Sequence, residues 1–275
     1  MGMDVIGMFM FLLGAIVGSF LNVCIVRMPH EKSIVMPRSH CVHCKKMIPW
    51  YDNIPIISYF ILRGKCRFCG EKISVRYFIV ELITACVFLG FYQYYTYHGR
   101  TILLWPYLFM VSGFIVATFV DFEHRIIPDE ISIGGMIAGL IFSLFIPELH
   151  DVPVYGRSWT IIHLHSFGLS LLGVLVGGGS IYLMGMLGDF LFKKESMGGG
   201  DVKLMAMVGA FMGWKMTILA FFIAPFFGAI YGIIEKIRTK DTAIAYGPFL
   251  VLGTLICLFW GDVIIAWIMR GYGLA

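Results

Sequence analysis

The feature that most constrains this chain is a series of long apolar runs that recur from one end to the other. A helix needs about 20 mainly apolar residues to cross the hydrocarbon core of a bilayer. The longer runs lie at residues 4–26, 77–97, 101–120, 131–147, 161–187, 216–234 and 248–269. Residues 202–214 make a shorter one. We therefore expect an all-α integral membrane protein with about eight transmembrane helices.

The composition agrees with this expectation. The chain of 275 residues is 59% hydrophobic and 14% charged, whereas soluble domains have about 45–50% and 25%. The composition therefore argues against a soluble fold. The first apolar run is too long for a signal-peptide core and ends at Arg27 without a small-residue cleavage site. We expect it to stay in the protein as an anchor.

The basic residues set the expected orientation. Membrane proteins keep Lys and Arg preferentially in cytoplasmic loops. With eight spans and the N-terminus outside, only Arg100, Arg157, Lys215 and Arg270 of the 21 basic residues fall outside. Topology and a basic surface facing the lipid bilayer thus explain the net charge of +4. No nucleic-acid partner is expected.

One soluble insertion divides the chain. We expect a first transmembrane helix at residues 1–26, a cytoplasmic loop at residues 27–76, and a seven-helix membrane core at residues 77–275. The insertion holds four of the seven cysteines, and the remaining cytoplasmic loops are short.

The four cysteines of the loop form two CxxC pairs. Cys41 and Cys44 are separated by 21 residues from Cys66 and Cys69, which is close to the spacing of four-cysteine zinc sites. The alternative, disulfides, would need an oxidising compartment, and the charge asymmetry places the loop in the cytoplasm. Four thiolates close a zinc tetrahedron, so we predict a structural zinc. His40 and His43 could substitute as ligands, but solvent-exposed loop histidines are the more ordinary interpretation.

Carboxylates at the membrane edge form the second set of candidate functional residues. Ionisable residues at bilayer depth are costly, so Glu81, Asp121, Asp129 and Asp201 are candidates for function. Asp121 ends one span and Asp201 opens another, both at the expected cytoplasmic face. Two carboxylates at one depth can act as base and acid on a water that attacks a peptide carbonyl. We therefore predict Asp121 and Asp201 as catalytic residues.

The same acids have simpler explanations. Asp129 follows Pro128 at the start of an apolar run, where a helix N-cap is sufficient explanation. Asp201 could also be only a helix cap, but the three glycines before it allow a substrate strand to approach closely. It also opens its helix, where free N–H groups favour an anion, so we expect it to be the base of the pair. The role of Glu81 stays open.

These residues together resemble the type IV prepilin peptidases, a family of GxGD aspartyl proteases. Gly198–Asp201 fits the GxGD motif, and Asp121 with Ile127–Asp129 fits its upstream partner. The resemblance extends to Gly18–Val23, Trp50–Pro55, Arg63–Cys66, Arg76, Tyr77 and Glu81. The chain departs from the family at Val42 and Phe78, where proline is common. These changes leave the predicted ligands and catalytic acids intact.

The resemblance implies an enzyme of the bacterial inner membrane with two activities. Such an enzyme removes the leader of prepilins or pseudopilins after a glycine, on the cytoplasmic side. It then methylates the new N-terminus with S-adenosylmethionine. No GxGxxG motif opens a βαβ unit in this chain, so methylation is implied by the resemblance alone and the cofactor-binding residues are unknown.

Two other functions remain open from the residues themselves. Intramembrane acids and glycine-broken helices also line the pathways of transporters and channels, although those need carboxylates deep in several spans. The third possibility is a membrane-anchored zinc module that binds partners or nucleic acid through its basic loop, although the loop lacks a clear basic and aromatic face.

Overall fold

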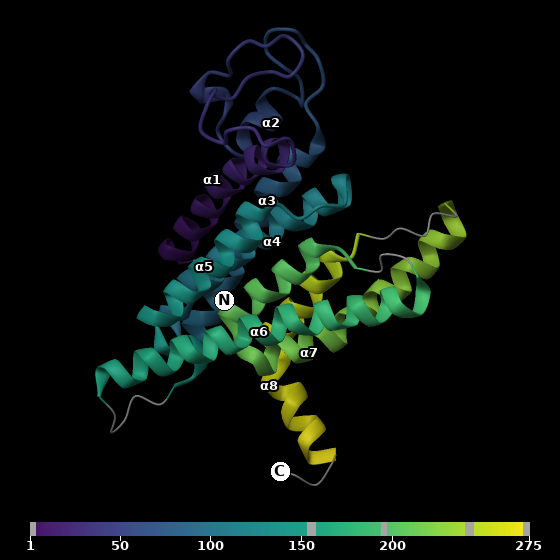
Figure 1. The fold of residues 1–275 in the computed structure, drawn as a ribbon. Coiled ribbons are helices and arrows are strands. Elements are labelled where there is room, and N and C mark those ends of the chain that lie inside the picture. The colour runs from purple at the N-terminus through teal and green to yellow at the C-terminus, as the bar shows by residue number, and fades with distance from the viewer. Residues whose placement is uncertain (1–3, 153–157, 194–196, 240–244, 272–275) are drawn as a thin grey trace. The chain divides into compact units, whose positions relative to one another are not determined.

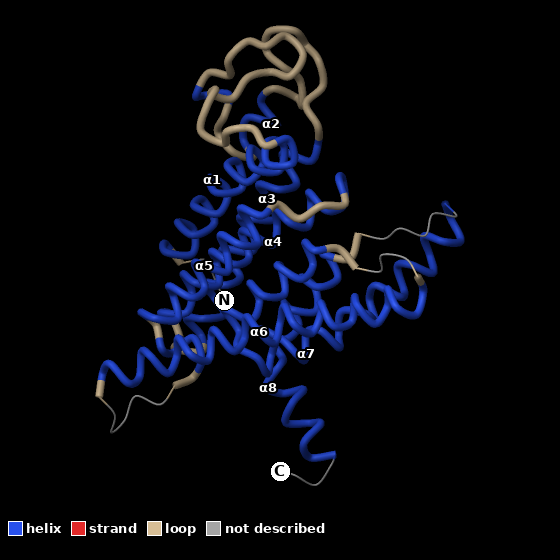
Figure 2. The backbone as a smooth tube through the Cα atoms, viewed as in Figure 1, coloured by secondary structure: helices blue, strands red, loops and turns tan. Residues whose placement is uncertain are grey.

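The computed structural model describes residues 4–152, 158–193, 197–239 and 245–271. These residues form helices joined by loops, and they contain no strand (Figure 2). They divide into two compact units, the first ending at Val116 and the second beginning at Ala117. The predicted all-α membrane fold is confirmed.

The first unit contains helices α1 (Val5–Arg27) and α3 (Val75–Tyr97), which pack against each other (Figure 1). The loop between them carries the short helices η1 (Met28–His30), η2 (Trp50–Asp52) and α2 (Ile57–Ile61). After α3 follow η3 (Thr101–Leu103) and α4 (Leu104–His124), which continues into the second unit.

Local polar groups define where α1 and α3 begin. Asp4 caps α1 by accepting the N–H of Gly7 at 2.6 Å, and its second oxygen accepts the Tyr92 hydroxyl of α3 at 2.9 Å. Ser74 caps α3 through the N–H of Arg76. The capped ends satisfy backbone donors that a helix leaves free.

Small residues let α1 and α3 approach closely. A Cβ at Gly14 would lie 2.7 Å from the carbonyl oxygen of Thr84 and 2.8 Å from the Cα of Ala85. A Cβ at Gly18 would lie 2.8 Å from the Cα of Glu81. This spacing is the small-xxx-small pattern of membrane helix pairs, in which backbone contact replaces the hydrophobic effect.

The second unit contains the end of α4, α5 (Asp129–Phe145), η4 (Pro147–His150), α6 (Trp159–Phe192), α7 (Gly199–Thr239) and α8 (Gly247–Gly271). Helix α7 packs against α5, α6 and α8 (Figure 1). Its first half supplies fully buried side chains, including Leu204, Met205 and Phe211.

A break in α7 reconciles the helices with the predicted count of spans. Gly213 has φ 68° and ψ 174°, so the helical path is interrupted there. The break separates the two apolar runs of the sequence at residues 202–214 and 216–234. Counted with this break, the long helices of the described residues make eight segments, close to the prediction. Six described helices are long and apolar enough to cross a membrane, and the 17-residue α5 falls short of that length.

The α1–α3 contact gives a test of the close packing. Gly14→Ala should lower the thermal unfolding midpoint in detergent, because the added methyl group meets backbone atoms of α3 that cannot move independently. The expected cost is about 1–3 kcal/mol. Gly90→Ala is the matched control, since a Cβ there has no described atom within 4 Å outside its own helix neighbourhood. Equal midpoints for the two variants would contradict the packing.

Candidate active site and metal centre

Asp121 lies in the last turn of α4 and is only 5% exposed. Its Oδ2 accepts the backbone N–H of Gly247, the first residue of α8, at 2.9 Å. A Cβ at Gly247 would lie 2.8 Å from the same oxygen. Only glycine therefore brings the start of α8 this close to the carboxylate.

Asp201 lies in the first turn of α7 and is 9% exposed. Its backbone N–H donates to the carbonyl of Gly198 at 3.1 Å. Its carboxylate is close enough to Asp121 for the two to interact electrostatically. The structure thus brings together the two acids that the sequence singles out.

Ile127, in the link between α4 and α5, packs close to the glycine that precedes Asp201 and to the glycine that donates to Asp121. A Cβ at Gly200, next to Asp201, would lie 3.1 Å from the Ile127 Cβ. A Cβ at Gly247 would lie 3.1 Å from the Ile127 Cδ1. Gly200 therefore serves packing against Ile127, whereas a Cβ at Gly199 would have no described atom within 4 Å outside its own helix neighbourhood.

The helix ends do not decide which acid is the base. The sequence argument considered only the helix that carries each acid, and it gave Asp201 the advantage of a helix N-terminus. Asp121 also lies at a helix N-terminus, because it accepts the N–H of Gly247 at the start of α8. Both carboxylates therefore have backbone donors nearby.

Asp129 does not cap its helix, so that interpretation is wrong. The cap position of α5 is Pro128, and Asp129 is the first helical residue. Its two carboxylate oxygens accept from Lys203 Nζ at 2.7 and 2.9 Å. The pair joins α5 to α7 two residues after Asp201. Because both side chains are about half exposed, we expect the pair to contribute less than about 1 kcal/mol.

Two residues of this region were missed by the sequence analysis. Gly247 is separated from Asp121 by 126 positions, and Tyr246 precedes it. Burial, and then the negative charge of Asp201, raise the pKa of Tyr246 to about 12. The phenol therefore stays neutral and keeps its O–H as a hydrogen-bond donor. A Tyr-Gly-Pro triplet before the last span is the only sequence signal, and it does not identify its partner.

The four loop cysteines gather as predicted. Their sulfur atoms all lie within 4.8 Å of one another, and Cys41 Sγ is 3.8 Å from Cys69 Sγ. Four thiolates at about 2.3 Å from a tetrahedral zinc would be about 3.8 Å apart. The donor set therefore fits zinc. Within the described residues, neither His40 nor His43 belongs to the cluster.

The two CxxC segments have the same local fold. In the first, the Cys41 N–H bonds to Lys46 O and the Lys45 N–H bonds to Cys41 O. In the second, the equivalent bonds join Cys66 to Glu71 and Gly70 to Cys66. Lys45 and Gly70 both have positive φ, 60° and 72°. The loop therefore offers two matching turns whose cysteines face one point.

Backbone donors and an ion pair prepare the second turn. The N–H groups of Cys69 and Phe68 lower the pKa of the Cys66 thiol to about 7, which favours the thiolate that binds metal. Between the cysteines, Arg67 donates to Asp52 of η2 through Nε at 2.7 Å and through Nη2. This two-point contact holds the turn against η2.

The metal cluster gives a direct test. The purified protein should carry one zinc per chain, and Cys66→Ser should lose it, because a three-thiolate set no longer closes the tetrahedron. Elemental analysis of the protein in detergent measures both. Cys86→Ser is the control, since Cys86 is exposed on α3 and lies outside the cluster. Zinc retained by Cys66→Ser would refute the assignment.

Comparison with known families covers both units. Residues 12–95 match the family model described as the bacterial peptidase A24 N-terminal domain, and residues 108–233 match the type IV leader peptidase family. No solved structure matches the chain significantly.

Curated relatives match over most of the chain. A prepilin leader peptidase/N-methyltransferase of Myxococcus xanthus is 37% identical over 84% of this chain, and the chain spans 63% of that relative. A protein of the same description from Legionella pneumophila is 34% identical over 91% of this chain and 90% of the relative. A type 4 prepilin-like proteins leader peptide-processing enzyme of Escherichia coli is 32% identical, with 90% and 91% covered.

Proposed function

Because the chain belongs to the type IV leader peptidase family, we propose that it is an intramembrane aspartyl endopeptidase with Asp121 and Asp201 as its catalytic residues. Its substrates are prepilins or pseudopilins, from which it removes the leader after a glycine. The observation that carries the proposal is the meeting of two buried carboxylates from α4 and α7.

The carboxylate pair suits peptide hydrolysis. One carboxylate takes a proton from a water molecule, and the oxygen attacks the carbonyl carbon of the scissile peptide. The other carboxyl group donates a proton to the leaving nitrogen, so the C–N bond breaks without a free amide anion. Burial of both groups makes their charges act strongly on the developing charges of the reaction. The neutral Tyr246 phenol beside Asp201 is a further donor for the carbonyl oxygen.

The protein is a multi-pass membrane protein, and we propose an orientation with the N-terminus outside and the cysteine loop in the cytoplasm of a bacterium. The first half of α7, Gly199 to Met212, measures roughly 21 Å at about 1.5 Å per residue. The hydrocarbon core is about 30 Å thick. The first half of α7 is therefore too short to span the bilayer alone. A membrane-held substrate can thus reach the end of this half-helix, which carries Asp201.

We propose methylation of the new N-terminus as the second activity, with S-adenosylmethionine as methyl donor. The support is the description of the relatives as leader peptidase/N-methyltransferases. We propose the cysteine cluster as a structural zinc site, because its donors leave no open position for a reacting molecule.

The other two functions are not favoured. A channel or transporter would need carboxylates deep in several spans, whereas the two buried aspartates of the described residues interact electrostatically with each other. The relatives are peptidases, and none of those reported above is described as a transporter or a zinc-dependent binding module.

Replacement of either aspartate tests the peptidase. Asp121→Asn and Asp201→Asn should each reduce leader removal by at least about 10²–10⁴-fold, because each removes a group that moves a proton. The double variant should be little worse than either single one, since the two act as a unit. Mass spectrometry of a co-expressed prepilin measures cleavage, and wild-type membrane insertion and accumulation confirm that the variants fold. Normal processing by either single variant would falsify the assignment.

The contact between Gly247 and Asp121 gives a finer test. Gly247→Ala should slow cleavage roughly 10- to 100-fold, because the methyl group displaces the start of α8 and the Asp121 carboxylate loses its N–H donor. Gly134→Ala on α5 is the control, since a Cβ there has no described atom within 4 Å outside its own helix neighbourhood. Cleavage rates of the two variants on one prepilin are compared. Equal rates would mean that the contact does not position Asp121.

A further inference from the structure

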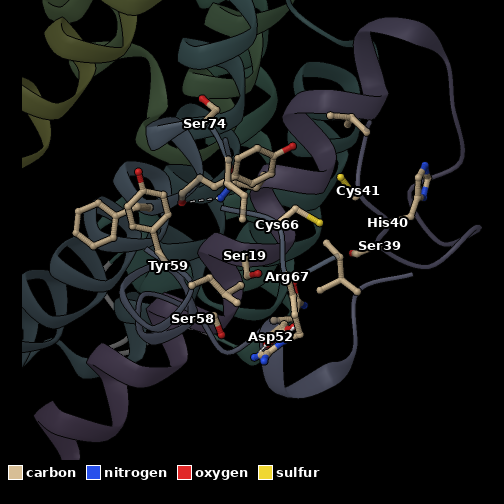
Figure 3. Close-up of a pocket in the computed structure, with 18 of the residues that line it drawn as sticks. Ser19, Ser39, His40, Cys41, Asp52, Ser58, Tyr59, Cys66, Arg67 and Ser74 are labelled. Carbon is tan, nitrogen blue, oxygen red and sulfur yellow. Dashed lines mark hydrogen bonds and ion pairs between the residues drawn. The ribbon is translucent and has the colours of Figure 1, made fainter. Parts of the chain in front are cut away.

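The first unit contains a cavity of about 520 Å³ beneath the cysteine loop. Sites for small molecules in proteins usually measure about 300–1,000 Å³. Residues from α1, α3 and the loop line it, among them Ser19, Asn22, Tyr59, Cys66 and Glu81. In Figure 3, Ser19 and Cys66 lie near the middle of the group, with Cys41 and His40 towards one side and Tyr59 towards the other.

Asn22 provides a buried acceptor in this lining. The residue is 1% exposed, and its Nδ2 donates to the Tyr77 carbonyl oxygen at 3.0 Å. Its Oδ1 has no hydrogen-bond partner in the part of the chain that the structure describes. Buried polar atoms without partners are rare in proteins. A ligand with an N–H or O–H group would satisfy this oxygen.

Glu81 provides a fixed negative charge. Its Oε2 accepts the N–H of Ile56 at 2.7 Å, and the Ser19 hydroxyl of α1 also bonds to the carboxylate. Two donors from different segments therefore hold one carboxylate at the cavity wall. A charge held in this way is suited to a cationic ligand.

The backbone that contacts Glu81 is strained. Ile56 has φ 64° and ψ −54°, and the Ile57 N–H bonds to the Pro55 carbonyl oxygen at 2.6 Å. This is a γ-turn with positive φ, which is rare and disfavoured for a β-branched residue. Strained backbone of this kind is enriched at ligand and active sites. The turn is thus maintained where it orients a carboxylate.

Aromatic and metal-binding residues complete the wall. Tyr59 and Phe78 line the cavity and stack on each other with centroids 5.4 Å apart. Aromatic faces bind planar bases and cations. Cys41 and Cys66 of the zinc cluster also line the cavity. The cysteine loop is therefore part of the same site, and the zinc cluster contributes to the wall of the cavity.

We propose that this cavity binds the methyl donor, an adenosyl sulfonium compound, with Glu81 facing its positive charge and Asn22 Oδ1 accepting a hydrogen bond from it. The inference rests on the methyl transfer proposed above. In that reaction the lone pair of the peptide amine forms the new C–N bond while the S–CH₃ bond breaks. Its electrons remain on sulfur, which becomes neutral, and the methylated ammonium then releases a proton to water.

Binding of S-adenosylmethionine to the full-length protein tests the site without relying on turnover. Isothermal titration in detergent is compared for wild type, Glu81→Gln and Asn22→Leu. Glu81→Gln keeps the size and an acceptor for Ile56 but removes the charge, so Kd should rise at least about tenfold. Asn22→Leu should also weaken binding, because the acceptor is lost.

Thr84→Val is the matched control for this titration. Thr84 is buried on α3 at the α1 interface, its hydroxyl donates to the Val80 carbonyl oxygen of its own helix, and it is not among the described residues that line the cavity. Its Kd should equal that of wild type. Zinc content reports whether the loop has folded in each variant.

Cross-linking of bound S-adenosylmethionine to wild type by ultraviolet light gives a second measurement that needs no variant. The labelled peptide should fall between residues 19 and 81. A label in residues 117–275, or wild-type Kd in both variants, overturns this location. Glu81→Gln could instead lose binding of a processed pilin peptide while keeping the wild-type Kd for S-adenosylmethionine. That result would assign the cavity to the amine substrate and would also overturn the proposal. Failure of wild type to bind the compound would instead reject the methyl transfer itself.

Discussion

Hydrocarbon offers no hydrogen-bond partner, and the described structure of this protein follows from that constraint. Backbone groups in a bilayer must be satisfied within the protein, so the chain forms helices wherever it is apolar. The same constraint acts on side chains, because a buried carboxylate without donors is costly. Asp121 satisfies this constraint by accepting a hydrogen bond from the N–H of Gly247, a donor that has no partner within α8 because it lies in the first turn. The position of α8 is thereby tied to the chemistry of α4.

The second unit brings together residues from four segments around the two aspartates. Ile127 contacts the environment of Gly200 on one side and Gly247 on the other, so the link after α4 fills the space between α7 and α8. Asp129 and Lys203 join α5 to α7 nearby. A site held in this way needs little rearrangement when charge develops in a reaction, which is the main source of electrostatic catalysis.

The first unit shows how a loop rich in basic residues, with only short helices, obtains a defined structure. Two turns with the same hydrogen bonds bring four thiols within 4.8 Å, and the Arg67–Asp52 pair fixes one of them to η2. The cysteine cluster could hold a metal ion, and metal binding would then supply folding energy that a loop of this size cannot draw from a core. Glu81 and the strained turn at Ile56 tie the loop to α3. The residues proposed for the two activities thus belong to different units of the chain.

The sequence by itself determined the helical membrane fold, the approximate number of helical segments and the cysteine tetrad, and it singled out two aspartates that are buried in the structure. Each of these depends on a local pattern, such as run length or CxxC spacing, that survives in any arrangement of the helices. Only the tertiary structure decided that Asp129 pairs with Lys203 rather than capping α5, that Gly247 donates to Asp121, and that Glu81 holds the turn at Ile56. These contacts join residues between 25 and 126 positions apart. Helix packing selects such partners, because side-chain volumes and close backbone approaches decide which distant groups meet, and no local pattern records that choice.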